Sequence, residues 1–267
     1  MKLIICGTGS AGGVGKSTLV QLLAEMYRHA GQDMTVLLAD DKGGDDNNSM
    51  ADMLPEHNVV WLGTGPTADE ITDDPDSLHR HWDKLSKVVG KTNLIVDFGA
   101  NVLQRFVQYA DASNSAARWK KAGVDVEVWL PFDNEPSNID AALDAMKSAA
   151  GAFGASKLIA VRNEKSGPFR GWEKSVHAAA IDVLRKRGAV DVVMPKCNAP
   201  LDTMEAARKQ RLSWFTVAAM AEDDLCKRLG FEDDDPVIGR MQNGVAKWIK
   251  SIYDNFGSLV PSAPGKE

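Results

Sequence analysis

The sequence has few cysteines and no long hydrophobic run. Its 267 residues include three cysteines, Cys6, Cys197 and Cys226, and their positions show no paired spacing. This usage indicates reduced thiols rather than a disulfide framework. No apolar stretch approaches the roughly 18 residues of a membrane-spanning helix. The apolar run at residues 3–6 is too short for a signal peptide. We therefore expect a soluble, cytoplasmic protein.

Positive charge is not in excess either. The 31 lysines and arginines stand against 37 acids and give a net charge of −6, which argues against a protein coated with positive charge. Two local basic clusters, at residues 185–187 and 208–211, could contact DNA non-specifically, and phosphate contacts would make that binding salt-dependent. The alternative is that they are solvated helix ends that complement the helix dipole.

Short apolar runs alternate with helical stretches along the chain. Continuously apolar strands separated by helices are typical of a parallel sheet covered on both faces, and right-handed crossovers would make it doubly wound. We expect one domain over residues 1–256 and a disordered tail over residues 257–267, which contain two prolines and two glycines. The expected strands are residues 3–6, 35–39, 58–62, 93–97, 124–130, 157–161 and 190–194.

A glycine-rich turn follows the first expected strand and leads into a helix. The run is Ser10-Ala11-Gly12-Gly13-Val14-Gly15-Lys16-Ser17-Thr18. Glycines let backbone N–H groups face a phosphate without a Cβ in the way, and the helix N-terminus adds partial positive charge. Lys16 would reach the β- and γ-phosphates, Ser17 would ligate Mg²⁺, and Thr18 would lie against the α-phosphate. The alternative is a turn that merely joins a strand to a helix.

The run from Gly12 to Thr18 resembles the deviant Walker A motif of the ParA/MinD class, which includes plasmid and chromosome partition ATPases. Later segments resemble that class in the same order: a strand leading into Asp40-Asp41, a strand ending at Asp97, and a strand leading into Arg162-Asn163. The stretch from Asp97 to Ala100 is similar to plasmid stability and conjugal-transfer relatives. The resemblance covers residues 1 to about 200. It implies an α/β P-loop NTPase fold, with a doubly wound, mostly parallel sheet.

The resemblance also implies roles for individual residues. Gly12, Gly13, Val14, Gly15, Lys16, Ser17 and Thr18 would bind the phosphates of ATP, and Ser17 and Asp97 would hold Mg²⁺. Either Asp40 or Asp41 would orient the attacking water beside Lys16. Asn163 would read the adenine, with Pro195 close to the base. Simple alternatives are a solvated acidic loop and a turn asparagine.

One position departs from the class. Its signature lysine is replaced by Ala11, so a cation that would reach the partner's phosphates across a dimer is missing. Such contacts stabilise transition-state charge. ATP binding is compatible with this change, whereas dimer-coupled hydrolysis is open.

These features predict an ATP-binding, weakly hydrolysing switch that positions or segregates a cargo such as a plasmid. A nucleotide-dependent homodimer and an adaptor protein are the expected partners. The alternatives are a non-hydrolysing nucleotide-dependent interaction module and a P-loop metabolic kinase or ligase. An apolar face over residues 241–256 could bind a membrane as in MinD, but packing of a last helix on the sheet explains it more simply.

Overall fold

The computed structural model describes residues 1–9, 13–40, 50–100, 102–154, 156–233 and 235–262. Within these ranges the chain forms one seven-stranded sheet whose order is β3-β2-β4-β1-β5-β6-β7. Every pair of neighbouring strands is parallel, so the predicted α/β sheet is confirmed. The strands are β1 (Lys2–Cys6), β2 (Thr35–Ala39), β3 (Asn58–Trp61), β4 (Leu94–Phe98), β5 (Asp125–Phe132), β6 (Lys157–Asn163) and β7 (Val190–Met194).

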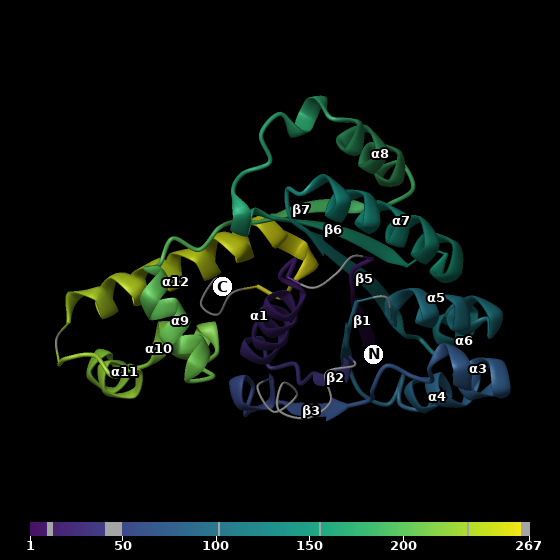
Figure 1. The fold of residues 1–267 in the computed structure, drawn as a ribbon, viewed down its shortest axis with the longest axis horizontal. Helices are drawn as coiled ribbons and strands as arrows, with labels where there is room; N and C mark the ends of the chain where they lie inside the picture. Colours follow the sequence, from purple (N-terminus) through teal and green to yellow (C-terminus); the bar gives the residue numbers. More distant parts are fainter. Residues whose placement is uncertain (10–12, 41–49, 101, 155, 234, 263–267) are drawn as a thin grey trace.

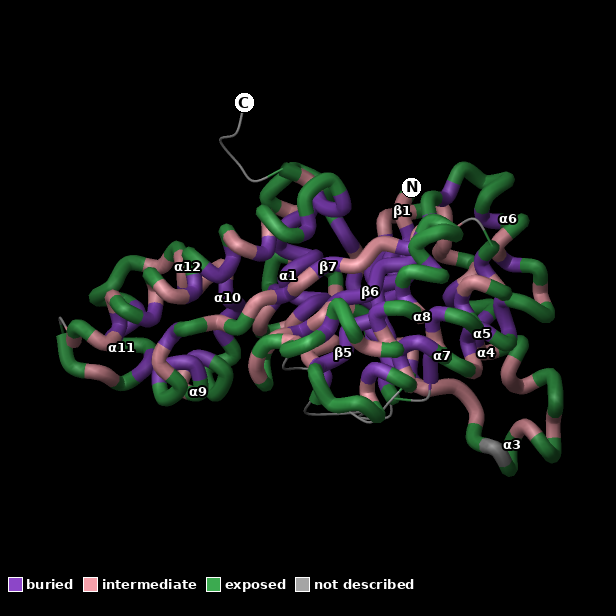
Figure 2. Tube along the Cα trace, turned by 90° about the horizontal axis from the view of Figure 1, so that it is seen from above, coloured by how far each residue is buried: buried purple, intermediate pink, exposed green. Residues whose placement is uncertain are grey.

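Helices cover both faces of the sheet (Figure 1). Alternation along β1 shows why: Leu3 and Ile5 belong to one hydrophobic core and Ile4 and Cys6 to the other. Figure 2 shows the buried residues concentrated along the strands and on the helix sides that face them. The described helices are α1 (Lys16–His29), α3 (Ala68–Asp73), α4 (Asp76–Ser86), α5 (Val102–Ala112), α6 (Ser115–Lys121), α7 (Pro136–Phe153), α8 (Val176–Arg185), α9 (Leu201–Lys209), α10 (Trp214–Ala219), α11 (Glu222–Leu229) and α12 (Pro236–Phe256).

The first core lies between one face of the sheet and α1, α9, α10, α11 and α12, and the second lies between the opposite face and α4 to α8. Helices α9, α10 and α11 gather around α12 at one end of the molecule (Figure 1). Helices α5 and α6 follow one another but are separate, because Asn114 between them adopts a left-handed conformation with φ 50° that a continuous helix does not tolerate.

The last helix packs against the sheet. The apolar face expected at residues 241–256 is buried in the first core, which is the simpler of the two readings of that pattern. Beyond it, Gly257–Leu259 forms a 3₁₀ turn, and Leu259 and Val260 are buried. The tail expected to be disordered from residue 257 is therefore packed as far as Val260, because two apolar side chains fit the core. No helix of the described ranges is long and apolar enough to cross a bilayer.

Parallel strands place their carboxyl ends at the same edge of a sheet, where ligands bind in doubly wound folds. Five of the candidate site residues lie there: Asp40 follows β2, Asp97 lies in β4, Asn163 ends β6, and Pro195 follows β7, while Lys16 begins the helix after β1. This buried parallel sheet, with a glycine loop and a helix after its central strand, is an α/β P-loop NTPase fold. Ala11, Gly12 and Asp41 lie outside the described residues.

Candidate functional site

The loop between β1 and α1 needs glycine at two described positions. Gly13 has φ 100° and Gly15 has φ 89°, which is the left-handed region that other residues rarely adopt. Gly15 is also the N-cap of α1, and a Cβ on it would overlap the amide nitrogen of Asn163. The first turn of α1 contains no acid, so its partial positive charge is open to an anion.

Lys16, Ser17 and Asp97 converge at the start of α1. The Lys16 ammonium forms an ion pair with Asp97 Oδ1, and the Ser17 hydroxyl donates to Asp97 Oδ2 at 3.2 Å. The Lys16 and Asp97 side chains are only 11% and 7% exposed. The register Cys6↔Asp97 between β1 and β4 fixes this approach. Burial and the Asp97 carboxylate raise the pKa of the Cys6 thiol well above its ordinary value, so Cys6 stays neutral.

The donor set fits Mg²⁺. Ser17 and Asp97 offer hard oxygens 3.2 Å apart, and Mg²⁺ in proteins takes one or two such ligands together with waters and substrate phosphates. The two residues that the sequence assigns to the metal are therefore neighbours at the helix N-terminus. When bound there, Mg²⁺ would supply charge to neutralise the phosphates.

Asp40 lies against the segment that follows β4. A Cβ on Gly99 would lie 2.8 Å from Asp40 Oδ1, and the Gly99 N–H donates to the Ala39 carbonyl at 2.8 Å. The Trp61 indole N–H donates to the Asp40 carbonyl at 3.3 Å. The acidic end of β2 and the glycine after β4 are thus in direct contact.

Asn163 is turned toward the phosphate loop. Its side chain is buried, with Nδ2 donating to the Val14 carbonyl at 2.8 Å and Oδ1 accepting from the Lys165 N–H at 3.1 Å. The Lys165 ammonium donates to the Gly13 carbonyl and lies 3.5 Å from Asp133 Oδ2. The amide expected to pair with adenine is therefore engaged by the loop itself.

Sequence reasoning missed Lys165 and Asp133. Asp133 directly follows a buried apolar strand, β5, which is the same signal that identified Asp97. Lys165 follows Asn163 by two residues, and nothing local indicates that its side chain reaches a loop 152 positions earlier.

A cavity of about 140 Å³ lies beside the loop, between the ends of β6 and β7 and the helices α9, α10 and α12. Pro195 lines it, and the Pro195 carbonyl accepts the Trp248 indole N–H at 2.6 Å. Arg208 lies over the Trp214 ring, 5.6 Å from its centre. None of the described residues in its lining is a carboxylate; the lining is Gly15, Thr18, Asn163, Lys165, Met194, Pro195, Lys196, Cys197, Leu201, Met204, Arg208, Trp214 and Trp248.

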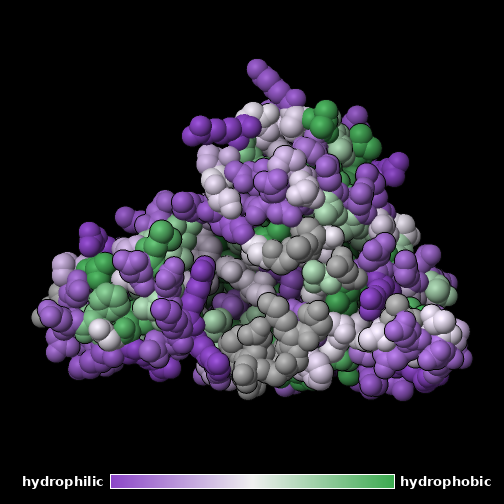
Figure 3. All heavy atoms as spheres, viewed as in Figure 1, coloured by the Kyte–Doolittle hydropathy of each residue, from purple (hydrophilic) through white to green (hydrophobic). Residues whose placement is uncertain are grey.

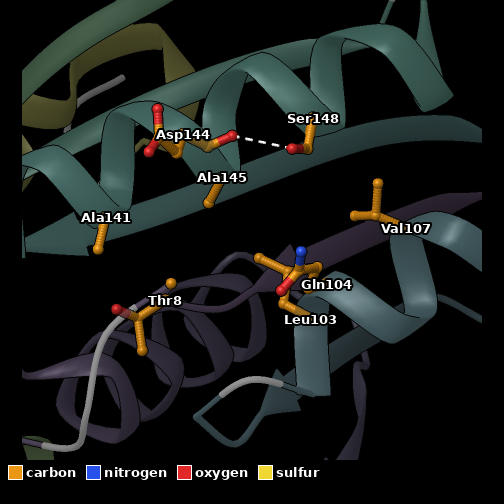
Figure 4. Close-up of a pocket in the computed structure, with 9 residues that line it drawn as sticks. Thr8, Leu103, Gln104, Val107, Ala141, Asp144, Ala145 and Ser148 are labelled. Atoms are coloured by element: carbon orange, nitrogen blue, oxygen red, sulfur yellow. Dashed lines mark hydrogen bonds between the residues drawn. The ribbon is translucent and has the colours of Figure 1, made fainter.

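A second cavity, of about 310 Å³, lies on the other side of the loop (Figure 4). Thr8 and Gly9 meet there with Leu103, Gln104 and Val107 of α5 and with Ala141, Asp144, Ala145 and Ser148 of α7. The Ser148 hydroxyl donates to the Asp144 carbonyl at 3.0 Å. Ala141 and Ala145 are small, which leaves the groove open between the two helices.

The basic clusters are partly neutralised within the chain. Arg185 pairs with Asp182 and Asp191, and Arg211 pairs with Asp52. These pairs reduce the positive charge that each cluster offers to a nucleic acid. The view in Figure 3 is mostly hydrophilic, with apolar residues visible over α8, where Val176 and Val183 are exposed, and at the end of the molecule where α9 to α11 lie.

Comparisons with known proteins find solved structures only. No family model matches the chain, and no curated protein matches it. It is similar to the signal recognition particle receptor FtsY from Elizabethkingia anophelis, with 14% identity, a TM-score of 0.38, and 72% of this chain and 58% of that chain covered. It is also similar to FlhF complexed with GMPPNP/Mg²⁺, with 11% identity, a TM-score of 0.42, and coverage of 75% and 67%. The chain thus spans 58% of the length of the FtsY chain. Neither match assigns a nucleotide or a function to it.

Proposed function

We propose that the chain is a ParA/MinD-like switch that binds ATP·Mg²⁺ in the cytoplasm and positions or segregates a cargo such as a plasmid. The observation that carries the proposal is the convergence of Lys16, Ser17 and Asp97 at the N-terminus of α1. A lysine, a hydroxyl and a carboxylate beside a glycine loop are the groups that a nucleoside triphosphate and its metal need. Residues 1–256 form the proposed single ATPase domain.

The cavity beside the loop supports ATP over GTP. Guanine presents an N2 amino donor that adenine lacks, and proteins that bind it need an acceptor at that place. The described lining contains no carboxylate, and its charged side chains, Lys165, Lys196 and Arg208, are donors. These donors fit the accepting atoms of either purine, N7 of adenine or O6 and N7 of guanine, so the proposed preference for adenine rests on the missing carboxylate acceptor for N2 and on the resemblance.

In the proposed switch Lys16 exchanges the Asp97 carboxylate for phosphate oxygens. Asp97 and Ser17 are then free to hold Mg²⁺ and its water. Asp40, in contact with Gly99, would orient a second water and transmit the change to a partner. Order in such loops commonly depends on the γ-phosphate. The proposal also includes Asp41, as the alternative to Asp40 for orienting the attacking water. It further includes a homodimer that forms when nucleotide is bound.

Hydrolysis in this proposal is slow, because Ala11 stands where the class has its signature lysine. A module that binds ATP without cleaving it is the second candidate, and the same alanine favours it. Phosphate release measured with the chain alone, with DNA and with a partner protein separates the two. A rate at background in all three conditions supports the second candidate.

Titration with ATP in the presence of Mg²⁺ tests the proposal directly. We expect saturable binding to the wild-type chain, weaker binding of GTP, and loss of both in Lys16→Ala. Lys209→Ala, a substitution of an exposed residue of α9, is the matched control and should bind as wild type does. Absence of ATP binding, together with an unchanged cellular phenotype of Lys16→Ala, overturns the proposal.

A further inference from the structure

We propose that Asn163 and Lys165 act as a latch that holds the phosphate loop in its anion-binding shape, and that they are positioning residues rather than readers of the base. The inference rests on the proposed function, since it concerns the same nucleotide site. It differs from the role that the resemblance implies for Asn163. The geometry points to it through two hydrogen bonds to consecutive carbonyls, those of Gly13 and Val14.

Both polar atoms of the Asn163 side-chain amide are hydrogen-bonded. Nδ2 donates to the Val14 carbonyl and Oδ1 accepts the Lys165 N–H, while only 3% of the residue is exposed. Gly15 gives this amide the space that it needs, because a Cβ there would overlap Nδ2. A buried amide with these partners is held in one orientation, since losing them would leave polar atoms without hydrogen bonds.

Lys165 anchors the preceding carbonyl. Its ammonium donates to the Gly13 carbonyl and is balanced by Asp133 at 3.5 Å. Asp133 is itself fixed, because its Oδ1 accepts from Asn138 Nδ2 at 2.7 Å and from the Glu135 N–H at 3.3 Å. The loop is thus tied through Lys165 to the residues at the start of α7.

The hydrogen bonds to the Gly13 and Val14 carbonyls also fix the direction of the N–H groups that follow them. The carbonyl of one residue and the N–H of the next belong to the same planar trans peptide and point in opposite directions. Anchoring the Gly13 and Val14 carbonyls toward β6 therefore directs the Val14 and Gly15 N–H groups away from β6. Successive N–H groups that face one side form an anion-binding concavity, which is what a phosphate chain requires.

Binding of three probes separates a latch from a base reader. The probes are ATP, GTP and inorganic tripolyphosphate, each titrated into wild type and Asn163→Ala in the presence of Mg²⁺. A latch predicts that all three lose affinity by a similar factor, about tenfold for one lost hydrogen bond, with the ATP-to-GTP ratio unchanged. An unchanged affinity for tripolyphosphate with an altered ATP-to-GTP ratio, or no change at all, overturns the latch.

Lys165→Met is the second variant, and it keeps the test decisive if Asn163→Ala does not fold, because Lys165 is exposed. It should lower the affinity for all three probes, and Lys165→Arg, which keeps the charge, should recover part of it. Glu164→Gln, in the same turn, is the control and should leave the three affinities unchanged. Amide hydrogen exchange supplies a readout without ligand: Leu19, whose N–H donates to the Gly15 carbonyl at 3.0 Å, should exchange faster in Asn163→Ala. If wild type binds no probe, the proposed function fails, while unchanged exchange overturns the latch itself.

Discussion

The Lys16 ammonium and the Asp97 carboxylate form an ion pair at the start of α1, and both side chains are almost fully shielded from solvent. Each group is also the one that the proposed function needs for something else, Lys16 for phosphate and Asp97 for Mg²⁺. A buried pair is strongly destabilised when only one partner is removed. In the proposed switch, the pair would hold the two charges in place until a triphosphate and a metal offer each of them a new partner.

Replacing the acid should separate metal binding from nucleotide binding. In Asp97→Asn, Lys16 has lost its competing partner, so we expect ATP binding in EDTA to persist. The gain in ATP affinity on adding Mg²⁺ should fall, because removing a group that holds a metal-bound water reduces metal affinity by about 10- to 100-fold. Titrations with Mg²⁺ and with EDTA measure both effects. Asp144→Asn, at an exposed carboxylate of α7, is the control, and an undiminished Mg²⁺ effect in Asp97→Asn would contradict the assignment.

Gly15→Ala should be more damaging than Gly31→Ala. Both glycines have a positive φ, 89° and 71°, and an L-residue in that region costs about 1–2 kcal/mol. A Cβ on Gly31 meets no described atom within 4 Å, whereas one on Gly15 overlaps the Asn163 amide. We expect Gly31→Ala to lower only the free energy of unfolding, and Gly15→Ala to lower it further and to abolish ATP binding. Chemical denaturation and ATP titration measure the two, and equal effects would contradict the close approach.

The sheet and the centre of the site could be predicted because their signals are local. The apolar run Leu94-Ile95-Val96 that leads into Asp97, and glycines followed by Lys16-Ser17, carry their meaning within one short segment. The position of Asn163 near the end of its strand was predicted in the same way, although β6 extends two residues beyond the expected end and includes Asn163. The direction in which its side-chain amide points was not predicted. The position of a residue at a strand end fixes its Cα but does not determine which neighbour its side chain bonds.

Contacts between distant segments account for what the sequence did not reveal. Lys165 meets Gly13 across 152 positions, and only the order of β1, β5 and β6 in the sheet brings them together. The packing of residues 257–260 was not expected for a related reason. Its prolines and glycines favour disorder, but Leu259 and Val260 find a place in the first core that composition does not show.

Trp61 should report the state of the acidic loop. It is 54% exposed and its indole donates to the Asp40 carbonyl, so a rearrangement at Asp40 changes the surroundings of the ring. We expect a change in tryptophan fluorescence when ATP·Mg²⁺ binds, and part of that change should be absent in Trp61→Phe, while the rest comes from Trp214 and Trp248 in the lining of the cavity. Binding measured by calorimetry should stay the same, because Trp61 lies at the edge strand and not in the cavity. A full fluorescence change in Trp61→Phe would place the rearrangement elsewhere.

Tyr253 should make the fold sensitive to alkaline pH. Burial, and then the nearby Glu25 carboxylate, raise the pKa of the Tyr253 hydroxyl to about 12 from an ordinary value of 10.0. In the unfolded chain this hydroxyl loses its proton near pH 10, whereas in the folded chain it keeps it, so the unfolded state is favoured as the pH rises from 10 to 12. Titration of this hydroxyl therefore leaves the free energy of unfolding unchanged below pH 10 and lowers it progressively between pH 10 and pH 12.

Tyr253→Phe isolates this contribution from the other groups that titrate there. The Tyr253 hydroxyl is buried and has no hydrogen-bond partner among the described residues, so removing it should leave stability at pH 7 equal or slightly higher. Between pH 10 and 12 the variant should lose stability less steeply than wild type. Denaturant midpoints at pH 7, 10, 11 and 12 provide the measurement. Parallel declines in the two proteins would show that the hydroxyl is solvated in the folded chain.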